Sequence, residues 1–264
     1  MRHKINEGLI KKASGVLAFV LLLSVFFIVS CAKKQTVRTT EIGPYSGPVN
    51  IEILKKNIGF GNISSIRSLV DVRVFKKGKS AGSFNGAFAY KAPGSMRISL
   101  FGPFGLTLLD VLITKDVLQA YLPPKNILYE RESPDISLNS LADDRSVYKM
   151  KDENNEYVLF ATKEKDSDSE VRARYIFDKT YILNRYIIFY KDGDEFIRID
   201  FDDFKGSVPG RTRIASGNKS ALEISLNNPD FDTEVPAEYF SPVEHGDKKV
   251  LPLQDILNRF DSIR

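Results

Sequence analysis

The chain contains a single cysteine, Cys31, at a position where a thiol nucleophile has a chemical use. A basic leader, Met1–Lys12, precedes an apolar run, Val16–Val29, which ends at Ser30 and Cys31. A charged leader, a short apolar region and a small residue before the junction are typical of an export signal. We therefore expect residues 1–30 to be a signal peptide, and Cys31 to become the first residue of the mature chain.

The four residues Ile28-Val29-Ser30-Cys31 resemble the lipobox of bacterial lipoproteins, in which the cysteine thiol receives the lipid. The alternative is a transmembrane anchor with an incidental cysteine, but the apolar run is shorter than the roughly 20 residues that a spanning helix needs. Several acyl chains on Cys31, palmitate among them, would anchor the protein firmly. Ala32 is not an aspartate-type retention signal, so we expect attachment to the outer membrane with the domain facing the periplasm.

Catalytic chemistry has few candidate residues. Of the two histidines, His3 leaves with the signal and His245 stands alone in a polar stretch, so the sequence has no histidine pair for zinc. The acidic stretch 166–170 lacks the glycine and terminal glutamate of a calcium loop and is better explained as a solvated hairpin tip. Nothing favours a hydrolase built on a carboxylate pair. We expect a protein that is not an enzyme and that has no metal and no cofactor.

The net charge argues against nucleic acid as a partner. The formal charge of +4 includes +3 from the leader, so about +1 remains after residue 30. No second cysteine exists for a disulfide, so the core alone must stabilise the fold. A mature chain of this length is expected to bury one sizeable core in one domain.

The composition divides the mature chain into three parts. Residues 31–48 are polar, with two Gly-Pro pairs, and are expected to form a flexible tether behind the lipid. The domain is predicted at 49–245 and begins with a short helix, Asn50–Lys56. Residues 246–264 are predicted to form an amphipathic C-terminal helix, because apolar residues after Pro252 recur on one helical face. This helix would dock on the domain or contact the membrane or a partner.

A period of two dominates the domain and predicts antiparallel strands with one buried face. Turns are expected at Lys76–Lys79, Ala92–Gly94 and Asp192–Asp194. One further helix is expected at Ile136–Asp144. The predicted strands begin at Ser68 and continue at 83–90, 96–100, 106–114, 117–122, 127–130, 156–162, 171–177, 181–190, 195–204, 211–215 and 222–227.

A curved sheet of about ten strands must close or be capped. The predicted fold is therefore mainly β, an unclosed antiparallel β-barrel or strongly curved sheet with a helical lid. Its concave face would enclose a cavity suited to acyl chains or lipids. Simple alternation is equally compatible with a solid core. The residues expected on the concave face are Val72, Val74, Phe84, Phe88, Met96, Ile98 and Leu100.

The stretch from Met96 to Gly105, continuing into Leu106–Asp110, resembles the LolB-like outer-membrane lipoproteins. In that family an arginine–aliphatic–x–aliphatic strand leads through an x-Pro-hydrophobic-Gly loop into another apolar strand. A preceding Phe-x-Gly-x-Phe at 84–88, a strand around Tyr121 and a late strand at 208–214 agree with the pattern. The resemblance extends over about residues 66–130 and is topological beyond.

The resemblance implies a LolA/LolB fold and a chaperone role, in which a periplasmic carrier delivers lipoprotein cargo for insertion into the outer membrane. It also implies a membrane-insertion loop, Gly102-Pro103-Phe104-Gly105, with Phe104 protruding. Proline and glycine neighbours leave Phe104 few places to be buried, although it could fold back onto the core. Two further roles stay open: an RseB-like envelope sensor, and a structural scaffold of the cell envelope with a filled core.

Overall fold

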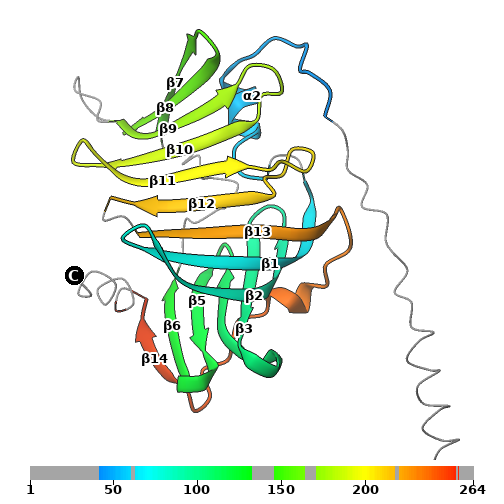
Figure 1. Ribbon diagram of the computed structural model, residues 1–264, viewed down its shortest axis with the longest axis vertical. Helices are drawn as coiled ribbons and strands as arrows, with labels where there is room; N and C mark the ends of the chain where they lie inside the picture. Colours follow the sequence, from blue (N-terminus) through cyan, green and yellow to red (C-terminus); the bar gives the residue numbers. More distant parts are fainter. Residues whose placement is uncertain are drawn as a thin grey trace, which may run out of the picture. The chain divides into compact units, whose positions relative to one another are not determined.

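A single sheet of 14 strands makes up most of the domain (Figure 1). In this computed structural model, the described residues are 42–60, 63–132, 146–163, 171–217, 220–253 and 255. They all belong to one compact unit, Val37–Arg264. The strand order is β14-β6-β5-β4-β3-β2-β1-β13-β12-β11-β10-β9-β8-β7. No helix among these residues is long and apolar enough to cross a membrane.

Neighbouring strands are antiparallel, except that β14 runs parallel to β6. Consecutive strands are joined mostly by tight turns, such as Lys77-Gly78 and Asp192-Gly193, in which both residues have positive φ. The strands are β1 (Ser65–Lys76), β2 (Lys79–Lys91), β3 (Ser95–Phe101), β4 (Thr107–Ile113), β5 (Val117–Leu122), β6 (Ile127–Glu132), β7 (Ser146–Glu153), β8 (Glu156–Lys163), β9 (Val171–Asp178), β10 (Asn184–Lys191), β11 (Asp194–Asp202), β12 (Arg211–Ser216), β13 (Ser220–Phe231) and β14 (Lys249–Pro252).

A short helix, α2 (Ile51–Lys56), precedes the sheet, as predicted. It begins because the Asn50 side chain accepts a hydrogen bond from the Ile53 N–H at 3.0 Å, which satisfies one of the free donors of the first turn. It ends at Asn57, whose N–H bonds to the carbonyl of Leu54. Three 3-10 turns complete the helical elements named here: η1 (Pro103–Gly105), η2 (Pro123–Lys125) and η4 (Ala237–Phe240).

One face of the sheet, called the inner face below, carries the apolar core. Residues paired directly across antiparallel strands point to the same side. The register passes from Tyr175 to Ile187, Ile199, Ile214, Leu222 and Val74, so strands β9 to β1 share this face. The pairs Val72–Phe84 and Phe88–Ile98 extend it through β2 to β3.

Two clusters of buried residues lie on the inner face. The first packs α2 against β8–β11 and contains Leu54, Ile58, Leu159, Tyr175, Phe177 and Ile187. The second lies over β1–β3 and includes Ile66, Val70, Val72, Phe88, Tyr90 and Leu100. Burying these side chains stabilises the fold by about 1.5–3 kcal/mol each. Helix α2 therefore covers the β7–β11 part of the face.

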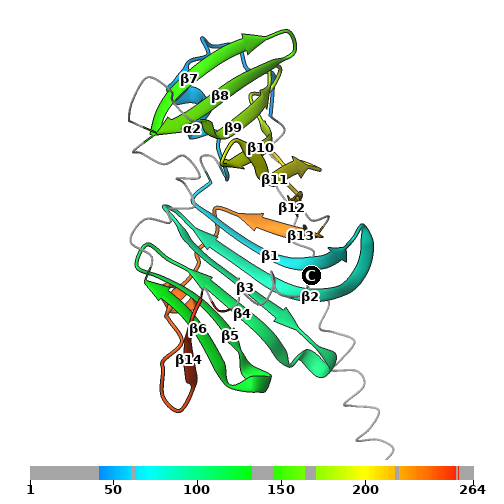
Figure 2. The same ribbon diagram turned by 90° about the vertical axis from the view of Figure 1, so that its left-hand side faces the viewer.

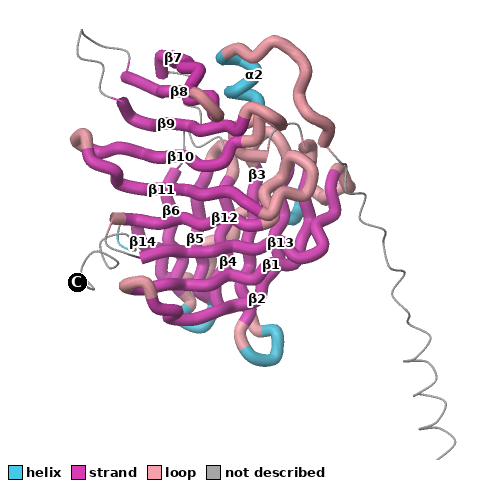
Figure 3. Tube along the Cα trace, turned by 45° about the horizontal axis from the view of Figure 1, so that its top comes forward, coloured by secondary structure: helices cyan, strands magenta, loops and turns pink. Residues whose placement is uncertain are grey.

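The sheet is strongly curved. In Figure 2, β1 and β2 bend along their length. In Figure 3, β3–β6 run across the direction of β10–β13. The edge strands β14 and β7 are not paired with each other, so the sheet stays open. This confirms the predicted mainly β, unclosed architecture.

The structure corrects some predicted boundaries. Strand β7 was not predicted, because its alternation mixes Lys149, Lys151 and Asp152 with few apolar residues. The predicted start of β10 is wrong by three residues, since the Asp178 carboxylate accepts backbone N–H groups of Thr180, Tyr181 and Leu183 and so fixes a turn at 178–183.

The predicted C-terminal helix begins too early, although Asp255 within it is helical. Residues 249–252 of the predicted C-terminal helix form β14, because they pair with the free edge of β6. Residue 254 and residues 256–264 lie outside the described residues, as do the predicted helix 136–144, the acidic stretch 166–170 and the signal with Cys31. At the other end, the Tyr45 N–H bonds to the Thr180 carbonyl at 2.8 Å, so part of the predicted tether contacts the turn between β9 and β10.

Candidate functional site

The seven residues predicted to line a concave face all lie on the inner face. Val72, Phe88 and Leu100 are buried there, and Phe84, Met96 and Ile98 pack against them while staying half-buried. Val74, also half-buried, pairs with Leu222 and Gly82 on the same side. The alternation therefore groups these seven side chains on one side of the sheet.

The inner face is apolar and only partly covered. Away from the strand ends, the inner positions of the described pairs from β9 to β5 carry no Asp, Glu, Lys or Arg. The charged pairs Lys76–Lys79 and Lys191–Asp194 lie next to tight turns. On β4, Leu109, Val111 and Ile113 are half-buried, and so are Leu222 and Ile224 on β13. Because these aliphatic side chains are only half-buried and form a continuous row, they leave an apolar surface on which an uncharged ligand can bind.

Two chain connections cover the middle of the inner face. Phe60 lies over β2, with its ring centroid 4.7 Å from that of Tyr90 and 5.9 Å from that of Phe88. Val208, from the β11–β12 connection, is fully buried in the same cluster. These contacts fill the face at β1–β2 and leave the half-buried row on either side.

The Gly102–Gly105 loop displays its phenylalanine completely. Phe104 is 100% exposed and Leu106 is 67% exposed. Pro103 starts η1 between β3 and β4, and both Phe104 and Gly105 have positive φ, at 60° and 74°. Positive φ is unfavourable for a bulky residue, so the backbone there is strained. The loop is closed by the Gly102 N–H, which bonds to the Leu106 carbonyl at 2.8 Å.

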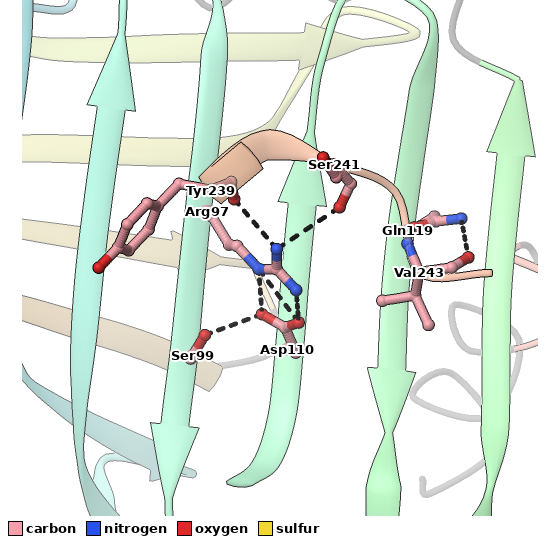
Figure 4. Close-up of polar contacts among 7 residues, drawn as sticks. All are labelled: Arg97, Ser99, Asp110, Gln119, Tyr239, Ser241 and Val243. Carbon is pink, nitrogen blue, oxygen red and sulfur yellow. Dashed lines mark hydrogen bonds and ion pairs between the residues drawn. The ribbon is translucent and has the colours of Figure 1, made fainter. Parts of the chain in front are cut away.

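A partly buried ion pair lies on the opposite, outer face of the same strands (Figure 4). The Arg97 guanidinium donates to both carboxylate oxygens of Asp110, and Ser99 donates to the same carboxylate at 2.8 Å. The hydrogen bond to Asp110 raises the pKa of Arg97 above its ordinary value. A short pair of this kind holds β3 to β4 through side chains as well as through the backbone.

The same arginine holds a C-terminal strap, residues 232–248, against the outer face. Arg97 donates to the Tyr239 carbonyl at 3.0 Å. Two strands further on, the buried Gln119 accepts from the Val243 N–H at 2.7 Å and donates to the Val243 carbonyl at 3.2 Å. Phe240 and Val235 pack on Ala89 and Leu112. The strap therefore forms a second layer outside β2–β6 and leads into β14.

Titratable groups form no recognisable catalytic arrangement in the part of the chain that the structure describes. His245 lies 3.3 Å from each carboxylate oxygen of Glu130 and is exposed. No cluster of three or more His, Cys, Asp or Glu suited to a metal ion occurs among the described residues.

Comparison with known proteins identifies the fold. No protein-family model and no curated protein matches the sequence. Among solved structures, a LolA superfamily protein from Nitrosomonas europaea has a TM-score of 0.52 at 14% identity, over 74% of this chain and 99% of its own. The chain has a LolA-like fold.

Two further structures share this LolA-like fold. A DUF1329 family protein from Desulfovibrio piger has a TM-score of 0.57 at 15% identity, over 72% of this chain and 95% of its own. A Vibrio parahaemolyticus domain assigned to outer membrane lipoprotein sorting has a TM-score of 0.54 at 12% identity, over 72% of this chain and 95% of its own. The resemblance inferred from residues 96–110 thus agrees with the architecture of the whole sheet.

Several residues of the site were missed from the sequence. Asp110 is the one charged residue in the apolar run 106–114, and a lone carboxylate there signals a buried partner. Its partner, Arg97, occurs in the motif, but the strap that Arg97 binds lies more than a hundred residues downstream. Phe60 sits in a Gly-Phe-Gly turn, and nothing in that local pattern indicates which strand its ring will cover.

Proposed function

We propose that this protein is a lipid-anchored lipoprotein of the outer membrane, and that its inner face binds acyl chains of lipids or of lipoprotein cargo. The observation that carries the proposal is the uncharged, half-buried row of aliphatic and aromatic side chains on that face. The LolA-like fold supports it, as does the lipobox at Cys31. The proposed role is binding and transfer, with no catalytic step and no cofactor, after delivery by a periplasmic carrier protein.

The first test is binding of a fluorescent fatty acid to a chain beginning at residue 32, which keeps every described element. Ile98→Gln places an amide in the half-buried row and should weaken binding about tenfold or more, because the apolar contact of one aliphatic side chain is lost. Leu69→Gln is the matched control, since Leu69 is 62% exposed on the outer face of β1. Equal affinities for the two variants would contradict binding at the inner face.

A scaffold role is the second candidate. It is favoured by Phe60 and Val208, which fill the inner face over β1–β2. A scaffold with a filled core should fold normally and bind no fatty acid. The wild-type protein in the same fluorescence titration separates the two functions.

The exposed loop is proposed to enter the bilayer while cargo is inserted. Because Phe104 has no buried area to lose, Phe104→Ala should leave the melting temperature nearly unchanged and lower cargo insertion into vesicles. Phe104→Glu should lower insertion further, since a carboxylate resists transfer into the apolar layer. Phe196→Ala, at a phenylalanine that is 51% exposed on β11, is the control. Normal insertion by Phe104→Glu would refute the role of the loop.

A further inference from the structure

Three connections meet at one end of strands β3–β6. The β3–β4 connection contains η1 and the β5–β6 connection contains η2, and Figures 1 and 2 both show these turns at the same end of the sheet. Because β14 is parallel to β6, its first residue, Lys249, pairs with Ile127 beside η2. The Lys249 N–H bonds to the Asn126 carbonyl at 3.0 Å, and the Asn126 amide donates to the Asp247 carbonyl at 3.4 Å.

This end combines apolar side chains with cations. Phe104 and Leu106 are exposed on the first connection. Lys125 and Lys249 are exposed on the neighbouring ones, and neither has an ion pair with another described residue. Lys248 lies over the Tyr121 ring, 5.6 Å from its centroid.

Acidic groups at this end are fewer. Asp247 is exposed between the lysines and His245, whose ring already faces Glu130. Three lysines against Asp247 leave the corner positive. At the opposite end of the same strands, the β4–β5 turn carries Lys115 beside Asp116, so its charges balance.

We propose that this end of β3–β6 docks on a bilayer surface rich in anionic phospholipid. The proposal rests on the membrane role proposed above for Phe104 and adds the lipid charge that the protein selects. Phe104 and Leu106 enter the interface, while the lysine ammonium groups stay at the level of the headgroup phosphates. Each lysine near an anionic surface strengthens binding about fivefold. An apolar tip with cations beside it fits a bilayer better than an acidic protein, which would offer the phenylalanine no apolar layer.

The test is sedimentation of the chain beginning at residue 32 with phosphatidylcholine vesicles, with and without phosphatidylglycerol. The wild-type protein should bind the anionic vesicles more tightly, and added salt should weaken that binding. Lys125→Gln/Lys249→Gln should lower affinity for anionic vesicles about 25-fold and leave affinity for neutral vesicles unchanged. Lys56→Gln/Lys115→Gln removes the same charge from exposed lysines elsewhere and should stay within about twofold of wild type, since neither lysine lies at the docking end.

Equal losses in the two double variants would show that only net charge matters and would overturn the proposal. Equal binding of wild type to neutral and anionic vesicles would also overturn it. The fluorescent fatty acid serves as the second readout, because both lysine variants should bind it normally. A wild-type protein that binds the fatty acid but shows no preference for anionic vesicles therefore refutes the docking end alone. Intact selectivity in a protein that binds no fatty acid refutes the acyl-binding function alone.

Discussion

Cys31→Ser should abolish incorporation of labelled palmitate and leave the chain at its precursor mass. The physical reason is that Cys31 is the only thiol in the sequence, and a serine hydroxyl is a much weaker nucleophile at neutral pH. The measurement is metabolic labelling with an alkyne fatty acid, followed by the mass of the purified protein. An inhibitor of lipoprotein signal processing should reproduce the precursor.

A matched control separates the position of the thiol from its mere presence. Cys31→Ser/Ser46→Cys restores a cysteine within the predicted tether, away from the lipobox, and should stay unlabelled. The lipoprotein assignment fails if Cys31→Ser is still cleaved after Ser30 and is extracted only with detergent.

Asp110→Ala should destabilise the domain by about 3–5 kcal/mol, because it leaves the Arg97 guanidinium poorly compensated between β3 and the strap. The Asp110 side chain is only 10% exposed and that of Arg97 is 24% exposed, so water replaces little of the lost interaction. The measurement is chemical denaturation. Limited proteolysis should also cut the strap faster, since Arg97 positions it through the Tyr239 carbonyl.

Two comparisons make this prediction specific. Asp202→Ala removes a carboxylate bonded to Arg211 at 2.6 Å on the exposed surface, and should leave the melting temperature nearly unchanged. Arg97→Met/Asp110→Leu replaces both charges by apolar groups and should recover much of the stability lost in Asp110→Ala. A double variant no more stable than Asp110→Ala would show that packing around β3 and β4, not the unpaired charge, is responsible.

The two faces of the sheet differ in what their residues do. Charges and hydrogen-bonding side chains on the outer face of β3–β6 hold the strap, whereas the paired inner side chains of those strands are apolar through β5. A change in the strap should therefore alter stability with little direct effect on the residues proposed to bind acyl chains. Ile98 and Asp110 lie on neighbouring strands but belong to different faces, so their variants test different properties.

The strands of the first half were predictable because the alternation that defines each strand involves residues that are neighbours in the sequence. Val70, Val72 and Val74 alternate with charged residues, and a strand with that period can bury only one side. The Lys77-Gly78 and Asp192-Gly193 turns were predictable for the same reason, since glycine favours the positive φ that these turns need. Strand β7 escaped prediction because an edge strand with alternating lysines carries little hydrophobic signal.

What the sequence by itself determined is therefore which residues of each predicted strand share a side. The exposure of Phe104, which the sequence left open, was decided by the structure. The tertiary structure alone decided which distant segments meet. The pairing of β1 with β13, the parallel addition of β14 to β6 and the seat of the strap on Arg97 and Gln119 all join parts far apart in the chain. Such contacts depend on closing long loops and on burying particular surfaces together, and neither quantity is encoded in a window of neighbouring residues.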